Sequence, residues 1–214
     1  MTSWSDIRLL VTDFDGVWTD DAVYVDQHGT ESVRCLRADG YGVTRLMAAG
    51  VPVIVLSAEV NPVVAARCAK LRVTCYQGLG DKNAVLRDIC AGGGVGSAPR
   101  EAISLEHVAY IGNDVNDIEC LNAVGLPILV ANAEPEVFEA LGMPAPLTVE
   151  EHVWHMLRDR SYDPTIEPPV SDGYVTYRKG GYGALREVCE LILEARLSRV
   201  EPSPSLARPK PDWG

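Results

Sequence analysis

Two carboxylates follow the first apolar run of the chain. Residues 7–12 (IRLLVT) are mostly apolar, and Asp13 and Asp15 come directly after them, followed by Gly16. At this spacing both side chains can turn towards one crevice at the end of a strand. Two carboxylates a few ångströms apart repel each other unless one is protonated or a divalent cation lies between them. The pair therefore indicates either a Mg²⁺ site with a carboxylate nucleophile, or a solvated turn, in which Asp is common.

A second group of oxygen-bearing side chains follows another apolar run, residues 107–111. Asn113, Asp114, Asn116 and Asp117 occur within five positions. A plain turn does not explain such a density of carboxylates and amides. Two strand ends of this kind in one parallel sheet could converge on a single cation.

Two further polar residues stand at predicted element boundaries. Ser57 follows the apolar run 51–56, where its hydroxyl and the adjacent backbone N–H of Ala58 could hold phosphate oxygens. Lys82 opens a predicted helix, where the helix dipole disfavours a cation unless an anion lies nearby. The alternatives are a turn or capping role for Ser57 and an exposed, solvated position for Lys82.

Strand and helix patterns alternate along the chain. Short apolar runs, rich in branched residues, are typical of strands buried on both faces. This alternation predicts an α/β fold with a doubly wound, mainly parallel, Rossmann-like sheet, whose ligand crevice lies at the carboxyl ends of the strands. The predicted strands are 7–12, 51–56, 107–111 and 126–130, and the predicted helices are 40–49, 61–71, 82–91 and 116–124.

Several segments lie outside this alternation. Alternating apolar and polar residues around Asp26 to Gly29 predict a β-hairpin over 22–36. The Gly-rich stretch 90–102 lacks the Lys-Ser/Thr of a phosphate-binding loop and is predicted to be a surface linker. We expect a single domain over 1–200, with an insert at 142–172 that contains a helix at 148–160, a strand and C-terminal helix over 173–197, and a disordered tail at 201–214.

Composition excludes several function classes. The 214 residues are 47% hydrophobic and can bury a substantial core, and the net charge of −11 argues against a general nucleic-acid or anionic-membrane surface. The six cysteines have no CxxC spacing and are expected to be buried small residues rather than zinc ligands. Without a signal-peptide pattern or an apolar run long enough for a membrane span, the chain is expected to be soluble and cytoplasmic.

In order and chemistry, these motifs resemble those of the haloacid dehalogenase-like phosphohydrolase superfamily. The resemblance is closest to the branch of 3-deoxy-D-manno-octulosonate 8-phosphate phosphatases and of phosphatase-like domains linked to acylneuraminate cytidylyltransferases. It covers residues 7–141 and 173–197. The supporting motifs are DFDGVWTD (13–20), RADGYGV (37–43), LSAEVNPVVAARCAKL (56–71), QGLGDK (77–82), YIGNDVND (110–117) and GGYGALREVCELIL (180–193).

The resemblance implies a role for each matching residue. Asp13 would attack phosphorus to form an aspartyl-phosphate, and Asp15 would act as general acid and then general base. Ser57, the Ala58 N–H and Lys82 would bind the phosphoryl group.

The resemblance also implies a metal site and an assembly. Mg²⁺ would be held by the Asp13 carboxylate, the Asp15 backbone carbonyl and either Asn113 or Asp114, with Asn116 and Asp117 in support. The branch has no large cap domain. Its hairpin builds a homotetramer, in which a neighbouring subunit closes each active site.

This chain departs from the family pattern in three places. Asn113 stands where most active members have Asp, which removes one charge from the metal site. Tyr182 replaces the arginine of a GGRG turn before the last helix. Arg178 and Lys179 are the candidates to compensate for it, and Arg37 is a further candidate for substrate binding. The insert at 142–172 has no family counterpart and is assigned either to structure and assembly or to substrate specificity.

The residues and the resemblance together predict a Mg²⁺-dependent phosphatase that acts on a phosphorylated sugar acid, of the octulosonate 8-phosphate or nonulosonate 9-phosphate type, or on a similar small sugar phosphate. The intact Asp13, Asp15, Ser57 and Lys82 favour this interpretation. Asn113 and Tyr182 favour an alternative, a catalytically weakened oligomerisation or regulatory module. A mutase is disfavoured because no large cap would shield a phosphoenzyme from water.

Overall fold

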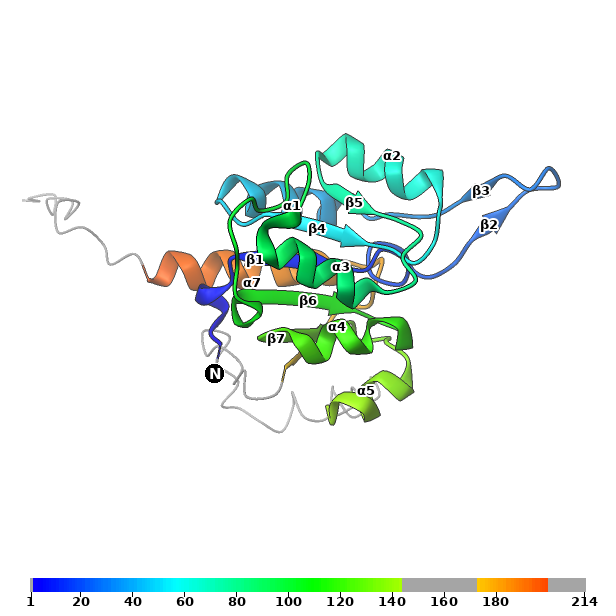
Figure 1. The fold of residues 1–214 in the computed structure, drawn as a ribbon. Helices are drawn as coiled ribbons and strands as arrows, with labels where there is room; N and C mark the ends of the chain where they lie inside the picture. Colours follow the sequence, from blue (N-terminus) through cyan, green and yellow to red (C-terminus); the bar gives the residue numbers. More distant parts are fainter. Residues whose placement is uncertain (1, 144–172, 200–214) are drawn as a thin grey trace, which may run out of the picture.

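Six strands pair in parallel to form one sheet in the computed structural model, which describes residues 2–143 and 173–199 (Figure 1). The central strands are buried along their whole length, as continuous apolar runs predict. In spatial order the strands are Thr74–Tyr76 (β5), Val53–Leu56 (β4), Leu9–Thr12 (β1), Val108–Gly112 (β6), Leu126–Leu129 (β7) and Tyr174–Val175 (β8).

Helices cover both faces of this sheet. Arg37–Ala48 (α1) and Ala184–Ser198 (α7) pack against each other on one face, and Lys82–Asp88 (α3) and Ile118–Ala123 (α4) pack together on the other (Figure 1). The predicted doubly wound, parallel α/β fold is therefore confirmed. The remaining helices are Pro62–Leu71 (α2) and Pro135–Leu141 (α5), the 3₁₀ turns Trp4–Asp6 (η1), Leu105–His107 (η3) and Val115–Asp117 (η4), and the π-helical turn Ile89–Gly93 (η2).

The differences from the predicted elements have local causes. Strand β5 and helix α5 were not predicted, because β5 is a half-buried edge strand of three residues and α5 spans only seven. Helix α1 begins at Arg37 rather than at residue 40, and Asp39 in its first turn accepts the Arg186 backbone N–H at 2.8 Å.

The Gly-rich segment 90–102 is only partly a surface linker. Its first residues belong to η2, and the side chain of Ala98 is buried in the core. The Ser97 hydroxyl lies 2.8 Å from the Thr74 hydroxyl and accepts the Thr74 backbone N–H at 3.2 Å. The segment thus packs on the outer strand β5 and covers the open edge of the sheet. The prediction of a surface linker is confirmed for its exposed residues and wrong for η2 and Ala98.

The predicted hairpin is confirmed. Tyr24–Val25 (β2) and Glu31–Ser32 (β3) pair in antiparallel fashion and project away from the carboxyl ends of the sheet strands (Figure 1). The Asp26 carboxylate accepts the backbone N–H groups of His28 and Thr30, which fixes the turn. Val23, Tyr24 and Val25 expose more than half of their surface.

The cysteine prediction is largely confirmed. All six thiols are free, four are buried and two, Cys35 and Cys75, are half-buried. Within 2–143 and 173–199 no helix is long and apolar enough to cross a membrane. The predicted insert from residue 144 onwards, its helix at 148–160 and the tail at 201–214 lie outside the described residues.

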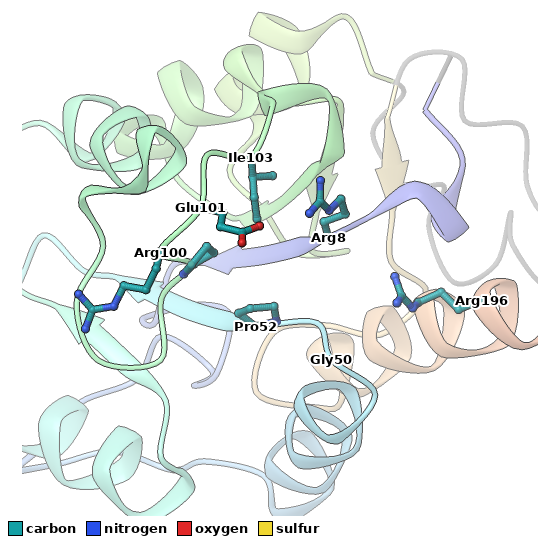
Figure 2. Close-up of a pocket in the computed structure, with 8 residues that line it drawn as sticks. Arg8, Gly50, Pro52, Arg100, Glu101, Ile103 and Arg196 are labelled. Carbon is teal, nitrogen blue, oxygen red and sulfur yellow. The ribbon is translucent and has the colours of Figure 1, made fainter.

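A pocket of about 270 Å³ lies at the amino ends of the strands (Figure 2). Arg8 immediately precedes β1 and Pro52 immediately precedes β4, and Arg196 of α7 completes one wall. The pocket is therefore on the edge of the sheet opposite to Asp13, which follows the last residue of β1.

Candidate active site

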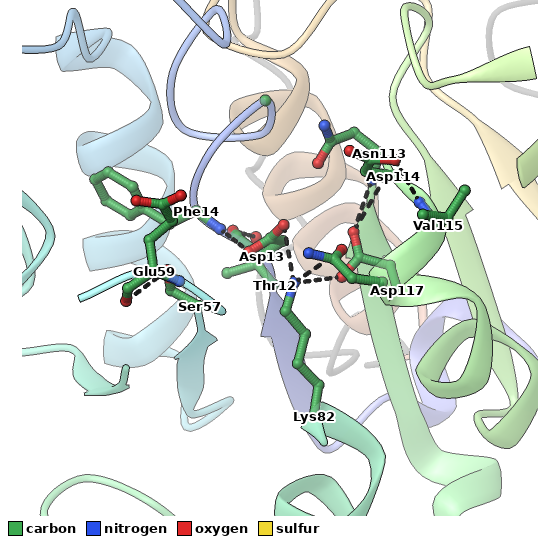
Figure 3. Close-up of polar contacts among 12 residues, drawn as sticks. Thr12, Asp13, Phe14, Ser57, Glu59, Lys82, Asn113, Asp114, Val115 and Asp117 are labelled. Carbon is green, nitrogen blue, oxygen red and sulfur yellow. Dashed lines mark hydrogen bonds and ion pairs between the residues drawn. The ribbon is translucent and has the colours of Figure 1, made fainter. Parts of the chain in front are cut away.

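The sequence-predicted residues gather at the carboxyl ends of the central strands (Figure 3). Asp13 follows β1, Ser57 follows β4, Asn113 follows β6, and Lys82 begins α3. All four are buried, with relative exposures of 1–6%. Buried polar groups need partners, and the contacts among these residues define the site.

Lys82 bridges two carboxylates. Its Nζ lies 3.0 Å from Oδ2 of Asp13 and 2.8 Å from Oδ1 of Asp117, and it donates to the Asn116 amide oxygen at 3.2 Å (Figure 3). Asp81 caps helix α3 by accepting the Ala84 N–H. The cation at the helix start is thus offset by two anions, and the alternative prediction of an exposed, solvated lysine is wrong.

The charges of this cluster perturb one another strongly. Burial raises the pKa of Asp13, the nearby Asp117 raises it further, and Lys82 opposes both. Burial acts to lower the pKa of Lys82, but the attraction of Asp13 and Asp117 outweighs it, so that the pKa is raised. Lys82 is therefore held as an ammonium ion.

Asp117 connects the two halves of the site. Besides Lys82, its Oδ1 accepts the Tyr110 hydroxyl at 2.7 Å, and its Oδ2 accepts the backbone N–H groups of Asn113 at 3.0 Å and Asp114 at 3.4 Å. The sequence analysis gave Asp117 only a supporting role and missed Tyr110. A signal was present, because a tyrosine in an apolar buried strand needs a hydrogen-bond partner for its hydroxyl.

Asn113 and Asp114 have different surroundings. The Asp114 carboxylate accepts the Val115 N–H at 2.6 Å and caps η4, a local role. The Asn113 side chain lies against Gly16 so closely that a Cβ on Gly16 would be 2.0 Å from its Nδ2. Its Oδ1 is buried without a hydrogen-bond partner. Asn113, rather than Asp114, therefore faces the loop that carries Asp13 and Asp15.

Asp15 and Ser57 lie beside this cluster. Asp15 is half-buried, and burial raises its pKa, with further contributions from the charges of Glu59 and Asp21. The Ser57 hydroxyl accepts the Glu59 N–H at 3.2 Å, which orders the turn that contains the exposed Ala58. The pKa values of both Asp13 and Asp15 are thus raised, and the Ser57 hydroxyl lies at the neighbouring strand end.

The predicted substrate residues lie further out. Arg37 is exposed at the start of α1, and Lys179 is exposed in the turn before α7. Arg178 extends over Gly183 and lines a pocket of about 420 Å³ with residues of α7, including Arg186 and Glu190. The structure does not bring these three cations together with Asp13, and their contact with substrate remains a prediction.

The oxygen donors present fit a hard divalent cation. Across the described ranges, no group of three His, Cys, Asp or Glu side chains is arranged to hold a metal ion. The candidate donors are instead the Asp13 carboxylate, the backbone carbonyl of Asp15 and the unpartnered Asn113 oxygen. Carboxylate, carbonyl and amide oxygens are the ligands that Mg²⁺ accepts in proteins.

A parallel sheet with a buried carboxylate and lysine at its carboxyl edge defines a class of phosphate-directed hydrolases. The family model of haloacid dehalogenase-like hydrolases matches residues 98–157. The 3-deoxy-D-manno-octulosonate 8-phosphate phosphatase of Salmonella typhi is 31% identical over 197 residues, which cover 92% of this chain and 84% of that protein.

Solved structures agree with this relationship. A 3-deoxy-D-manno-octulosonate 8-phosphate phosphatase from Yersinia pestis superposes with a TM-score of 0.69 at 29% identity, covering 90% of this chain and 84% of that one. One from Moraxella catarrhalis, in complex with magnesium ion, phosphate ion and KDO, has a TM-score of 0.68 at 28% identity, covering 91% and 90%. The chain belongs to the haloacid dehalogenase-like hydrolase family and is a phosphatase.

Proposed function

We propose that this chain is a Mg²⁺-dependent phosphatase that hydrolyses the phosphate ester of a small sugar acid through an aspartyl-phosphate on Asp13. The relatives that match nearly its whole length are named for 3-deoxy-D-manno-octulosonate 8-phosphate, and the substrate is of the octulosonate 8-phosphate or nonulosonate 9-phosphate type. The observation that carries the proposal is the buried Asp13–Lys82 pair, with Asp15 two residues away.

In the first step a carboxylate oxygen of Asp13 attacks phosphorus, and the bond between phosphorus and the sugar oxygen breaks. Asp15 donates a proton to the departing sugar oxygen. Its raised pKa favours the protonated form that this step needs. In the second step a water molecule attacks phosphorus, Asp15 accepts its proton, and inorganic phosphate leaves with Asp13 restored.

Lys82 and Ser57 would hold the phosphoryl oxygens during both steps. Lys82 keeps its contact with Asp117 when Asp13 carries the phosphoryl group, so that its position is maintained. The Ser57 hydroxyl and the Ala58 N–H lie at the adjacent strand end and would bind further oxygens.

Asp13, the Asp15 carbonyl and Asn113 would hold Mg²⁺. When bound, the cation would offset the negative charge of the phosphate and of the two carboxylates. Asn113 contributes an oxygen but no charge, so this site should bind Mg²⁺ more weakly than one with a carboxylate at position 113.

The proposal is tested by phosphate release from a panel of phosphorylated sugar acids and neutral sugar phosphates, with and without Mg²⁺. Asp13→Asn preserves the shape of the side chain and should reduce kcat by at least about 1,000-fold. Asp88→Asn, at the exposed end of α3, is the matched control and should keep full activity. If the folded wild type releases no more phosphate than Asp13→Asn on every substrate, the chain is a non-catalytic module.

We further propose that the hairpin forms subunit contacts in a homotetramer. Val23, Tyr24 and Val25 present adjoining apolar side chains to solvent in the single chain, and such a patch favours burial against another protein surface. Light scattering gives the mass in solution, and a monomer at micromolar concentration would contradict this assembly.

A further inference from the structure

Arg34, near the base of the hairpin, is held in place by contacts with Asp20 and Tyr182. Arg34 lies between β3 and α1, and its Nε donates to the Asp20 carboxylate at 2.9 Å. The guanidinium carbon lies 4.2 Å from the centroid of the Tyr182 ring. The side chain of Arg34 remains 37% exposed. A residue from the hairpin base is thus held by the loop after Asp15 and by the turn before α7.

The wall on which Arg34 rests has a fixed backbone. The Gly181 N–H donates to the Val17 carbonyl at 2.9 Å, and a Cβ on Gly180 would be 1.7 Å from the Gly16 carbonyl oxygen. The Thr19 hydroxyl accepts the N–H groups of Gly16 and Asp21. The turn with Tyr182 and the loop with Asp15 are therefore in direct contact, which fixes the position of Arg34 relative to Asp15.

The surroundings of Asp15 are otherwise acidic. The carboxylates of Glu59, Asp21 and Glu31 lie around that of Asp15, so negative charge surrounds this part of the site. Lys82 is buried between Asp13 and Asp117 in the interior. An anionic group on the non-phosphate part of a substrate would be repelled here unless a cation outside the phosphate site received it.

The guanidinium of Arg34 has capacity for such a group. Asp20 accepts from Nε, and Nη2 is buried. The side chain is nevertheless 37% exposed, and this accessible part of the guanidinium can receive an anionic group. A planar guanidinium binds a carboxylate through two nitrogens, and stacking on an aromatic ring leaves its edge available for this purpose.

We propose that Arg34 binds the carboxylate of the sugar acid, and that Tyr182 and Asp20 position its guanidinium. The inference rests on the proposed function and assigns a specificity-determining residue to it. Arg34 discriminates between acidic and neutral sugar phosphates, whereas Asp13, Asp15 and Lys82 act on the phosphate that both kinds of substrate share.

The test compares kcat and KM for 3-deoxy-D-manno-octulosonate 8-phosphate and for glucose 6-phosphate. Arg34→Gln should raise the KM for the acidic substrate about 10- to 100-fold, which corresponds to the loss of a hydrogen bond between charged groups. The same variant should change the KM for glucose 6-phosphate less than about twofold. Arg34→Lys, which keeps the charge without the planar fork, should give an intermediate KM. Tyr182→Ala should raise the KM for the acidic substrate less than Arg34→Gln does, and Tyr182→Phe should leave this KM unchanged.

Arg45→Gln is the matched control. Arg45 is also paired with a carboxylate, Glu190, and also lies over a tyrosine ring, that of Tyr41, but it is on the outer face of α1. Equal KM changes on both substrates in Arg34→Gln, or no change on either, would overturn the inference. So would equal KM changes in Arg34→Gln and Arg45→Gln.

Calorimetry with the free sugar acid, which carries no phosphate, separates this inference from the proposed function. The wild type should bind it, and Arg34→Gln should weaken the binding at least about tenfold. If that difference is seen but no substrate is hydrolysed, the recognition stands and the phosphatase proposal fails. If the acidic substrate is hydrolysed but Arg34→Gln binds the free sugar acid as tightly as the wild type does, the phosphatase proposal stands and the role of Arg34 is refuted.

Discussion

The floor of the site and its rim are built differently. The floor consists of Asp13, Lys82, Asp117 and Tyr110, which are buried and joined by contacts of 2.7–3.0 Å. The rim consists of Asp20, Arg34 and Tyr182 with the hairpin; Tyr182 and the β2 residues Tyr24 and Val25 are more than half exposed.

The difference follows from the cost of burying charge. An ionised group in the interior is tolerated only when other groups satisfy it, so the residues of the floor depend on one another. A half-exposed group keeps part of its hydration and tolerates replacement. Under the proposals above, the reaction would depend on an interdependent cluster, and substrate choice on residues that can change separately.

The largest expected effect is that of Lys82→Met. It removes the cation between two buried carboxylates, and leaving buried charges without a partner costs about 3–5 kcal/mol. We expect this loss in the free energy of unfolding, measured with urea, together with a fall in phosphate release of at least about 100-fold. Lys70→Met, at an exposed position of α2, is the control. A loss below about 1 kcal/mol would contradict the interdependence of the floor.

Asp39→Asn tests whether the partners of a buried carboxylate outside the floor offset the cost of burying its charge. Asp39 is buried, its Oδ1 accepts the Arg186 N–H, and its Oδ2 has no partner in the described chain. Burial raises its pKa from 3.8 to about 6, against the opposing effects of the Arg186 N–H and of Arg178. Because the folded-state pKa is the higher one, stability is lost as pH rises from about 4 through 6.

The difference between Asp39→Asn and wild type should accordingly depend on pH. At about 1.4 kcal/mol per pKa unit, the variant should be more stable by up to about 3 kcal/mol above pH 7. The two proteins should converge below pH 4. Urea unfolding between pH 4 and 8 measures this, and parallel curves would show that the carboxylate is satisfied after all.

Asn113→Asp tests the metal side of the floor. If Asn113 is a ligand, the added charge should tighten Mg²⁺ binding about tenfold, as measured by calorimetry. Asp114→Asn, which removes a charge from the adjacent helix cap, should change the affinity much less. The reverse pattern would assign the metal to Asp114.

Tyr110→Phe removes one hydroxyl from the floor without changing its volume. The loss of the hydrogen bond to Asp117 should cost about 1–2 kcal/mol of stability and lower kcat several-fold with little change in KM. Tyr24→Phe, on the exposed hairpin, provides the comparison. An unchanged kcat would show that Asp117 holds Lys82 without help from Tyr110.

The smallest expected effect is that of Tyr24→Ser, in strand β2 of the hairpin. Its side chain is 58% exposed, so the stability of the single chain should change by less than about 0.5 kcal/mol. The same variant should weaken the proposed tetramer, which light scattering over a range of concentrations would detect. An unaltered mass would remove the hairpin from the assembly.

Sequence periodicity predicted the central sheet well, because β1, β4 and β6 are buried on both faces and consist of continuous apolar runs. It failed for β5, whose three residues are half-buried at the sheet edge and show no such pattern. The hairpin was predictable for a local reason, since Asp26 and Gly29 specify its turn.

The site was predictable only in part. The positions of Asp13, Ser57 and Lys82 follow from the rule that parallel strands bring their carboxyl ends to one edge. The proximity of Asn113 to Gly16, which favours Asn113 over Asp114 as the proposed metal ligand, is three-dimensional information that the sequence does not contain. The pairing of Arg34 with Tyr182 joins residues 148 positions apart, and no local pattern encodes it.

The glycines around Tyr182 restrict how this enzyme can diverge. A side chain at position 180 or 181 would collide with the backbone of residues 16–20, so variants there should be eliminated by selection. Position 182 points outwards and is 56% exposed. Genetic drift can therefore sample side chains at this single place in the turn, while the contact of the turn with the loop that carries Asp15 is kept.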